Sequence, residues 1–432
     1  MRRLVNQFFE KQLRYSPYFY KRLRVIQNLN KYSASELKAE QEKRLIALVH
    51  KAYHKSQFYA HLYQKHRVNV DKIKSVRDLQ YLPVITKHDV VPNREHIFIG
   101  SKLNRFKANT SGTSGYTVRV YRNYESIVEE GAYLWTHRMQ YGHKPGMKTL
   151  VMRANLNFFE KERYDPFTKT LYLSSYQLKL QNAEWYYNRI KEFKPNAIFA
   201  YPSSVESLAN FFTLLNKQLH IPAVFTSSET LYSYQREKVE RVFNTKIADW
   251  YGNAERTIAL QQNSEGSYDQ LSLYSVNEFE KEHVITTGLI NDSFPLIRYK
   301  VDDILLTDQA QQGYAPDASI TEIQGRSDDV LLLPDGTRVG LICGAFDGVN
   351  HVLFSQIVQE DAYTFYINMV VNKEYGAPDE ALLKKQVEDF VGNQINYTIR
   401  YVQESDIIKS KSGKFKLIVN KMSKKEQETL IS

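Results

Sequence analysis

The chain has 432 residues, of which 42% are hydrophobic and 25% charged, and its formal net charge is +10. This length is too great for one typical hydrophobic core, so we expect one large domain and a smaller one. A single cysteine, Cys343, excludes an internal disulfide and a multi-cysteine zinc site, and no run of about 18 apolar residues that could span a membrane occurs.

The N-terminal segment is strongly basic. Its charges could contact an anionic membrane surface or nucleic acid, although a solvated helix face is the simpler interpretation. Because no basic patch of the single-strand-binding kind appears, nucleic acid is not an expected partner. No apolar core follows the first charges, so a secretory signal is not expected and we predict a cytoplasmic protein. The basic residues are Arg2, Arg3, Lys11, Arg14, Lys21, Arg22 and Arg24.

Residues 1–90 are predicted to be mostly helical. Within residues 37–66, apolar side chains recur at three- and four-residue spacing, which predicts one buried helix face. These side chains are Leu45, Leu48, Val49, Ala52 and Tyr53. Pro83 then interrupts the pattern, and Thr86 is expected to cap a new short helix through its hydroxyl.

Residues 100–330 alternate short β-rich runs with helical stretches, which is the pattern of an α/β domain. Helices are expected at about 204–219 and 230–243. Strands are expected at 149–154, 197–201, 223–228, 247–252 and 284–289.

Beyond about residue 330, the pattern predicts a small α+β domain. It has a hairpin turn at Asp335-Gly336 and a helix from Asp379 to about Gly392. The predicted fold class is therefore α/β, with a large multi-layer N-terminal domain at 1–327 and a small mobile C-terminal domain at 328–432.

A run of hydroxyl residues and glycines is the first candidate functional segment. Backbone N–H groups and side-chain oxygens can converge there on phosphate oxygens, because glycine lacks the Cβ that would block the approach. The run is not a Walker A loop, since no Gly-Lys-Ser/Thr ends it, and a flexible turn is the alternative. It consists of Thr110, Ser111, Gly112, Thr113, Ser114 and Gly115.

Carboxylates follow two of the strand-like runs. Glu255 comes after 247–252 and could hold Mg²⁺, which prefers one or two carboxylates with phosphate oxygens and water. A helix start with Glu255 in its first turn is the alternative. An aspartate of the pair Asp302-Asp303 could accept hydrogen bonds from ribose hydroxyls, or it could be an ordinary turn residue.

Two further segments lie toward the C-terminus. In Gly325-Arg326-Ser327-Asp328-Asp329, the arginine could contact ribose or phosphate and Asp328 could be a hinge, whereas a polar linker is the alternative. The glycine-tipped loop 410–416 presents Lys414, which by itself indicates only an exposed basic turn.

Together and in this order, the five segments resemble the core motifs of the adenylate-forming (ANL) superfamily. Within it, the chain is most similar to the branch of phenylacetate–CoA ligase and coenzyme F390 synthetase. That similarity rests on LPVITKHDV at 82–90, AYPSS at 200–204 and TSSETL at 226–231. Glu255 followed by Arg256 is more like the capsular-polysaccharide-type, CapK-like members.

The resemblance implies that the protein binds ATP and Mg²⁺ and activates a carboxylic acid as an acyl-adenylate. Lys414 would be the catalytic lysine, reaching the α-phosphate and the substrate carboxylate, and Glu255 would hold the metal. The run 110–115 would hold the β- and γ-phosphates. The other implied nucleotide contacts are Ser228, Glu229, Tyr251, Gly252, Asp303 and Arg326.

The sequence departs from the family pattern in two places. Tyr116-Thr117 stand where a lysine and often a proline are usual, which removes one cationic phosphate contact. Val301-Asp302 stand where Thr-Gly is usual, so Asp302 could compete with Asp303 as the ribose ligand.

The acid and the acceptor stay open at this stage. The acid is an aryl, acyl or uronic acid, and the acceptor is either the CoA thiol, giving a thioester, or an amine, giving an amide in surface-polysaccharide synthesis. A catalytically decayed homologue that acts as a nucleotide-binding or scaffold protein is the alternative to an enzyme.

Overall fold

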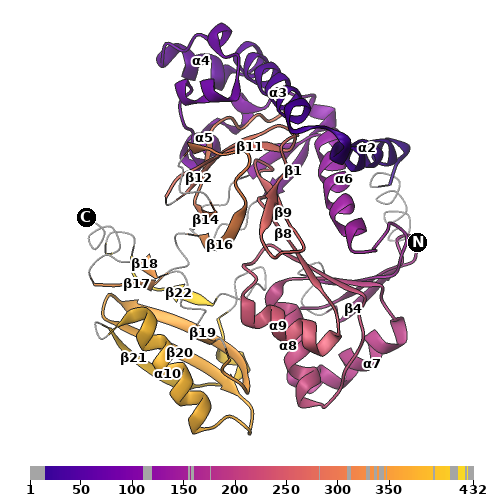
Figure 1. Cartoon of the computed structure of the whole chain (residues 1–432), viewed down its shortest axis with the longest axis vertical. Coiled ribbons are helices and arrows are strands. Elements are labelled where there is room, and N and C mark those ends of the chain that lie inside the picture. The colour runs from indigo at the N-terminus through magenta and orange to yellow at the C-terminus, as the bar shows by residue number, and fades with distance from the viewer. Residues whose placement is uncertain are drawn as a thin grey trace. The chain divides into compact units, whose positions relative to one another are not determined.

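The computed structural model divides into two compact units (Figure 1). Unit 1 comprises Met1–Pro145 and Ala248–Ile323, and unit 2 comprises Gly146–Ile247 and Gln324–Ser432. The predicted domain boundary after residue 327 and the predicted hinge at Asp328 lie outside the described residues. The structure describes residues 15–109, 119–153, 156, 160–175, 177–281, 283–308, 313–326, 331–334, 338–339, 345–346, 348–392, 395–408, 417–423 and 426.

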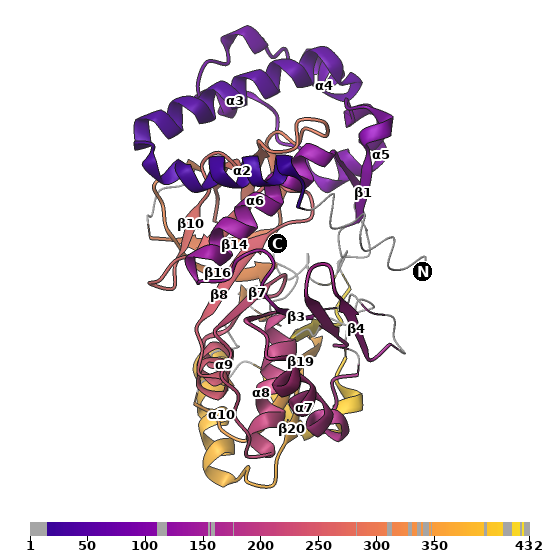
Figure 2. The same ribbon diagram turned by 90° about the vertical axis from the view of Figure 1, so that its right-hand side faces the viewer.

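The first part of unit 1 is helical, which confirms the prediction from residue 15 onward. Its helices are α2 (Pro17–Gln27), α3 (Ala34–Lys55), α4 (Gln57–Lys65), α5 (Lys87–Ile97) and α6 (Tyr124–Gln140). Thr86 stands at the N-cap of α5, where the Asp89 carboxylate accepts hydrogen bonds from its N–H and its hydroxyl, both 2.8 Å long. Figure 2 shows α2 lying across α6.

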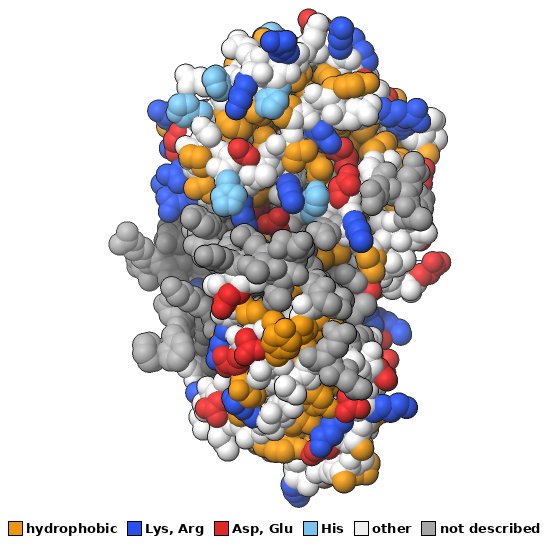
Figure 3. All heavy atoms as spheres, turned by 90° about the vertical axis from the view of Figure 1, so that its left-hand side faces the viewer, with side chains coloured by type: hydrophobic (Ala, Val, Ile, Leu, Met, Phe, Trp, Pro, Cys, Tyr) orange, Lys and Arg blue, Asp and Glu red, His pale blue; other side chains and the backbone are white. Residues whose placement is uncertain are grey.

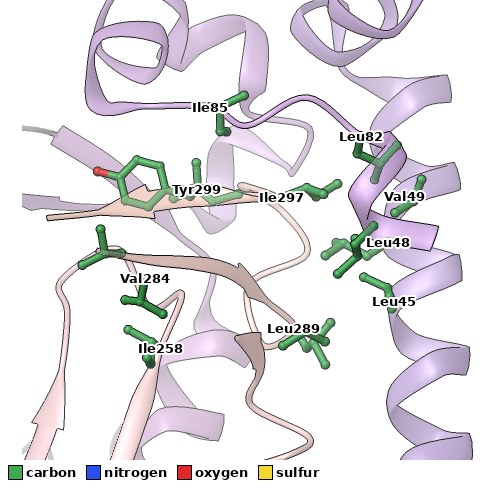
Figure 4. Packing of buried hydrophobic residues seen from close by; sticks show 14 of the residues in the cluster. Leu45, Leu48, Val49, Leu82, Ile85, Ile258, Val284, Leu289, Ile297 and Tyr299 are labelled. Carbon is green, nitrogen blue, oxygen red and sulfur yellow. The ribbon is translucent and has the colours of Figure 1, made fainter. Parts of the chain in front are cut away.

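Helix α3 contributes one face to the core of unit 1. Leu45, Leu48, Val49 and Ala52 are buried as predicted, whereas Tyr53 is only half-buried. Figure 4 shows Leu45 and Leu48 pointing toward Leu289, which belongs to the same core. The core therefore ties the N-terminal helices to strands that follow some 200 residues later in the chain.

The second part of unit 1 is built of strands. The predicted alternation of strand and helix is wrong for residues 247–326, because strands β8 to β16 follow one another there without a helix in the described residues. Short turns connect them, and such turns join antiparallel neighbours without a crossover helix. Within unit 1, hydrogen-bonded neighbours follow the order β14-β16-β10-β9-β8, and a separate four-stranded sheet has the order β13-β12-β11-β15. The strands are β8 (Ile247–Gly252), β9 (Ala259–Gln262), β10 (Tyr268–Gln270), β11 (Ser275–Phe279), β12 (Val284–Gly288), β13 (Tyr299–Val301), β14 (Asp303–Thr307), β15 (Gly313–Tyr314) and β16 (Ile320–Arg326).

Unit 2 begins with a mostly parallel sheet, in which the predicted alternation is confirmed. Its order is β7-β6-β3-β5-β4, and only β4 is antiparallel to its neighbour. The strands are β3 (Thr149–Met152), β4 (Glu162–Asp165), β5 (Thr170–Leu173), β6 (Ala197–Ala200) and β7 (Ala223–Ser227). The helices are α7 (Ala183–Phe193), α8 (Pro202–Leu214) and α9 (Ser233–Phe243).

The C-terminal part of unit 2 is the expected small α+β fold. Strands β17 (Leu331–Leu332) and β18 (Arg338–Val339) pair antiparallel on either side of the predicted Asp335-Gly336 turn, which itself lies outside the described residues. A four-stranded sheet of order β21-β20-β19-β22 packs against α10. The bounds of α10 differ by one or two residues from those predicted for the helix. Its elements are β19 (Val352–Asp361), β20 (Thr364–Val371), α10 (Ala377–Val391), β21 (Asn396–Tyr401) and β22 (Ile418–Asn420).

Candidate active site

Two of the predicted motifs interlock in unit 1 through a pair of tyrosine–carboxylate hydrogen bonds. Tyr251, in β8, donates its hydroxyl to Oδ2 of Asp303 at 2.6 Å, across 52 positions of sequence. Tyr299, in β13, donates its hydroxyl to Oε1 of Glu255 at 3.2 Å, across 44 positions. Each motif thus supplies one hydroxyl and one carboxylate, and the predicted metal ligand and ribose ligand are held by the same two segments.

The segment that leads to Tyr299 is fixed by buried polar contacts. Arg298 has a left-handed backbone with φ of 50°, and its guanidinium makes two parallel bonds of 2.9 and 2.8 Å to the Glu278 carboxylate. Bidentate pairs of this kind are geometrically specific. The buried Tyr59 hydroxyl donates to the Pro295 carbonyl at 3.1 Å and accepts from the Ile297 N–H at 3.0 Å. The arginine of the motif therefore has a positioning role.

Glu255 lies on a tight turn after β8, so the alternative of a helix start is wrong. The side-chain oxygen of Asn253 accepts from the Thr257 N–H at 2.9 Å, and its amide donates to the Thr257 hydroxyl at 2.7 Å. Arg256 adopts φ of 59° and donates Nη1 to the Ser126 carbonyl of α6 at 2.6 Å. A left-handed arginine is costly, and persists only where the surroundings hold it.

A second arginine holds the same turn from the other side. Arg122, the last residue of β2 (Arg119–Arg122), donates Nη2 to the Ala254 carbonyl. Burial, and next the charge of Arg256, lower the pKa of Arg122 to about 10, while Glu130 acts in the opposite direction. The turn that carries Glu255 is thus held by two guanidiniums, that of Arg122 through the Ala254 carbonyl and that of Arg256 through the Ser126 carbonyl.

Gly288 gives a test of how tightly this turn is held. A Cβ at this last residue of β12 would stand 2.6 Å from the Arg256 carbonyl oxygen, which is a backbone atom. We expect Gly288→Ala to cost about 1–3 kcal/mol of unfolding free energy, as overpacking does, and to raise the Mg²⁺ concentration needed for half-maximal activity. Denaturant unfolding and a Mg²⁺ titration measure the two effects.

Gly131 is the matched control for that substitution. Its Cβ would make only an ordinary contact, 3.7 Å from the Phe19 ring, inside helix α6. Gly131→Ala should therefore stabilise the protein by about 0.5–1 kcal/mol through helix propensity. A Gly288 variant as stable as the wild type would show that the Arg256 turn is not constrained.

Asp302 and Asp303 have different neighbours in the structure. Asp302 pairs with Lys87 of α5, with 3.0 Å between Oδ2 and Nζ, whereas Asp303 lies beside Tyr251. Only Asp303 therefore shares a hydrogen bond with another predicted nucleotide residue. Its role as the ribose ligand stays a prediction.

In unit 2, two of the segments that carry the family resemblance meet at the start of α8. Oε2 of Glu229, after β7, accepts from the Ser203 backbone N–H at 3.1 Å, and Pro202 begins the helix. A carboxylate is favourable there because the first N–H groups of a helix lack intrahelical partners. Ser228, next to it, is exposed and has φ of 73°. The predicted nucleotide residues thus form two groups, Tyr251, Gly252 and Asp303 in unit 1 and Ser228 and Glu229 in unit 2.

Several predicted residues lie outside the described part of the chain. They are Thr110 to Gly115, which connect the antiparallel strands β1 (Phe106–Asn109) and β2 (Arg119–Arg122), and Lys414, before β22. Arg326 is the last residue of β16, and its side chain is not described. Sequence reasoning did not assign Tyr299, Arg298, Arg122 or Arg256. Arg298 and Tyr299 stand just before the Asp302-Asp303 pair and Arg256 directly follows Glu255, so these positions were the available signal, whereas no local pattern distinguishes Arg122.

Glu255 fits a magnesium ion held with a nucleotide. Mg²⁺ commonly takes one or two protein carboxylates and completes its shell with phosphate oxygens and water. No group of three His, Cys, Asp or Glu residues that could hold a metal ion by themselves occurs in the described ranges.

Comparison with known proteins first defines the class. The chain has the fold of a 2-hydroxyisobutyryl-CoA ligase whose crystal structure contains a hydroxyacyl-AMP, with a TM-score of 0.70 over 92% of each chain and 15% identity. The predicted class, a large α/β N-terminal domain with a smaller C-terminal domain in the adenylate-forming fold, is confirmed.

Sequence comparison shows which proteins with this fold the chain resembles. The protein CapK of Staphylococcus aureus is 26% identical over 96% of this chain and 95% of its own length, and residues 331–421 match the CapK C-terminal domain family. The predicted resemblance to CapK-like members of the adenylate-forming superfamily is confirmed. An indoleacetate–lysine synthetase of Pseudomonas savastanoi is 22% identical over 52% of this chain and 59% of its own length. No helix within the described ranges has the length and apolar character needed to cross a membrane.

Proposed function

We propose that this protein is an AMP-forming ligase, which activates a carboxylic acid with ATP and transfers the acyl group to an acceptor. The observation that carries the proposal is the paired contact of Tyr251 with Asp303 and of Tyr299 with Glu255. It links the two segments that carry the proposed ribose ligand and the proposed metal ligand, as a site for one nucleotide and its metal requires. The shared fold with a ligase that holds an acyl-AMP supports the same reading.

The chemistry of the first step explains the proposed roles. A carboxylate attacks the α-phosphorus of ATP, and pyrophosphate leaves, so negative oxygens crowd one centre. Mg²⁺, when bound at Glu255, supplies positive charge there, and the Lys414 ammonium would stabilise the same transition state. Backbone donors of 110–115 would orient the pyrophosphate, and Asp303 would hold the ribose hydroxyls.

Two of the similar proteins differ in the acceptor that their names give. The 2-hydroxyisobutyryl-CoA ligase is named for CoA, a thiol, and the indoleacetate–lysine synthetase for lysine, an amine. The similarity to CapK over nearly the whole chain leads us to favour an amine and a uronic-acid sugar, with formation of an amide in surface-polysaccharide synthesis. CoA is the second candidate acceptor.

Pyrophosphate exchange tests the proposal and orders these candidates. The purified protein is incubated with ATP, Mg²⁺ and labelled pyrophosphate, with aryl, acyl and uronic acids in turn. Label should enter ATP only with a cognate acid, and AMP should then accumulate on addition of either CoA or an amine. If no acid supports exchange and ATP does not bind, a scaffold role replaces the enzyme.

A further inference from the structure

Helix α2 and the short 3₁₀ turn that follows it, Asn28–Lys31, present a cationic and aromatic face that the proposed reaction does not use. Its inner side is firmly attached to α6. Phe19, Leu23 and Ile26 are buried, and Arg22 donates from Nε and Nη2 to the two Glu129 oxygens at 2.6 Å. The helix is therefore a fixed part of unit 1, and its outer side has a defined composition.

The outer side carries positive charge and lacks negative charge. Lys21, Arg24 and Lys31 are exposed, and none of them has an ion-pair partner in the described part of the chain. Between residues 15 and 35 there is no Asp or Glu. On the face shown in Figure 3, which is opposite to that of Figure 2, basic and acidic side chains are mixed. The positive charge of the α2 face is thus concentrated locally, in addition to the net charge of +10 of the whole chain.

Tyrosines border this charge. Tyr18, Tyr20 and Tyr32 are 38%, 43% and 50% exposed, and Val25 is 37% exposed. The helical period of 3.6 residues places Lys21 and Arg24 in the middle of the exposed arc, with Tyr20 at one edge and Tyr18 at the other. Tyrosine prefers the membrane–water boundary, where its ring is apolar and its hydroxyl is hydrated.

We propose that the α2 face docks the protein on an anionic lipid surface. A convex helix side with cations in its centre and tyrosines at its edges complements a flat layer of acidic headgroups. The sixteen residues before α2 have the same charge sign, since they contain four basic residues and one acidic residue. Nucleic acid would be attracted by the same positive charge, and the experiments below separate it from lipid.

Sedimentation with sucrose-loaded vesicles tests the proposal. The full chain should bind vesicles that contain phosphatidylglycerol and not vesicles of phosphatidylcholine alone, and 1 M salt should release it, because the Debye length falls to about 3 Å. The triple variant Lys21→Glu, Arg24→Glu, Lys31→Glu should lose at least about tenfold in partitioning, since each basic residue near such a surface adds about fivefold. The double variant Tyr18→Ser, Tyr20→Ser should bind severalfold more weakly at unchanged net charge.

The variant Lys72→Glu, Lys74→Glu, Arg77→Glu is the matched control. These exposed residues lie in the same unit, and their reversal changes the net charge by the same amount. The control should bind vesicles within about twofold of the wild type, and all variants should keep the wild-type circular dichroism and pyrophosphate exchange.

The same experiments can overturn the proposal. If both triple variants lose vesicle binding equally, net charge alone drives the binding. If the protein binds neutral and acidic vesicles equally, it does not recognise acidic headgroups. α2-dependent binding to a DNA oligonucleotide, without binding to vesicles, would assign the face to nucleic acid instead.

Discussion

Lys414→Ala is expected to abolish adenylation while leaving the use of a pre-made acyl-adenylate largely intact. In the proposed reaction the lysine stabilises charge that develops at the α-phosphate, so its contact is made chiefly in the transition state. Loss of one such contact costs about 3–4 kcal/mol, which corresponds to a fall of roughly two to three orders of magnitude in rate. Pyrophosphate exchange measures the first half-reaction, and acceptor-dependent AMP release from synthetic acyl-adenylate measures the second.

Lys411 and Lys416 are the controls for this prediction. Both stand within three residues of Lys414 in the same basic stretch, so their alanine variants make the same change in charge. Each should keep exchange near the wild-type rate. A fully active Lys414→Ala variant, with a large loss at Lys416, would mean that the family alignment is shifted at this loop.

Asp303→Ala is expected to weaken ATP binding by about 10- to 100-fold. The substitution removes the proposed acceptor of the ribose hydroxyls and also the acceptor of the Tyr251 hydroxyl, at 2.6 Å. Hydrogen bonds to a charged group contribute about 1.5–3 kcal/mol each, which sets this range. Isothermal titration with a non-hydrolysable ATP analogue gives the affinity.

Asp302→Ala makes the same chemical change one position earlier. Asp302 is 42% exposed and its partner Lys87 is 22% exposed, and ion pairs in such surroundings contribute about 0–1 kcal/mol. The variant should bind ATP within about threefold of the wild type, and Lys87→Ala should behave like it. An equal or larger loss of affinity at Asp302 would transfer the ribose contact to that residue.

The amino-acid sequence alone determined what depends on short stretches of chain. The helical face of α3 was predictable because residues three and four apart share one side of a helix, and four of the five predicted residues are buried. The strands β3, β6, β7 and β8 begin at the predicted residues 149, 197, 223 and 247, whereas β4 and β5 were not predicted. The motif order predicted the resemblance to the adenylate-forming superfamily, since each motif is contiguous. Boundaries were less certain, because the last residues of a strand depend on neighbours elsewhere in the sheet.

Tertiary structure decided which of the motif residues act together. Asp302 and Asp303 are equivalent carboxylates in the sequence, and only the fold gives them different partners, Lys87 for Asp302 and Tyr251 for Asp303. The strands at 247–252 and 284–289 were predicted, whereas the others up to residue 326 were not, because a short apolar run suits a helix or a strand and pairing with neighbours selects between them. The sequence places Arg256 directly after Glu255 but does not predict its left-handed turn, which is held by the Ser126 carbonyl, with the backbone close to Gly288. Contacts between distant segments carry free energy that no local pattern records, so the tyrosine–carboxylate pairs at the centre of the site became visible only in the folded chain.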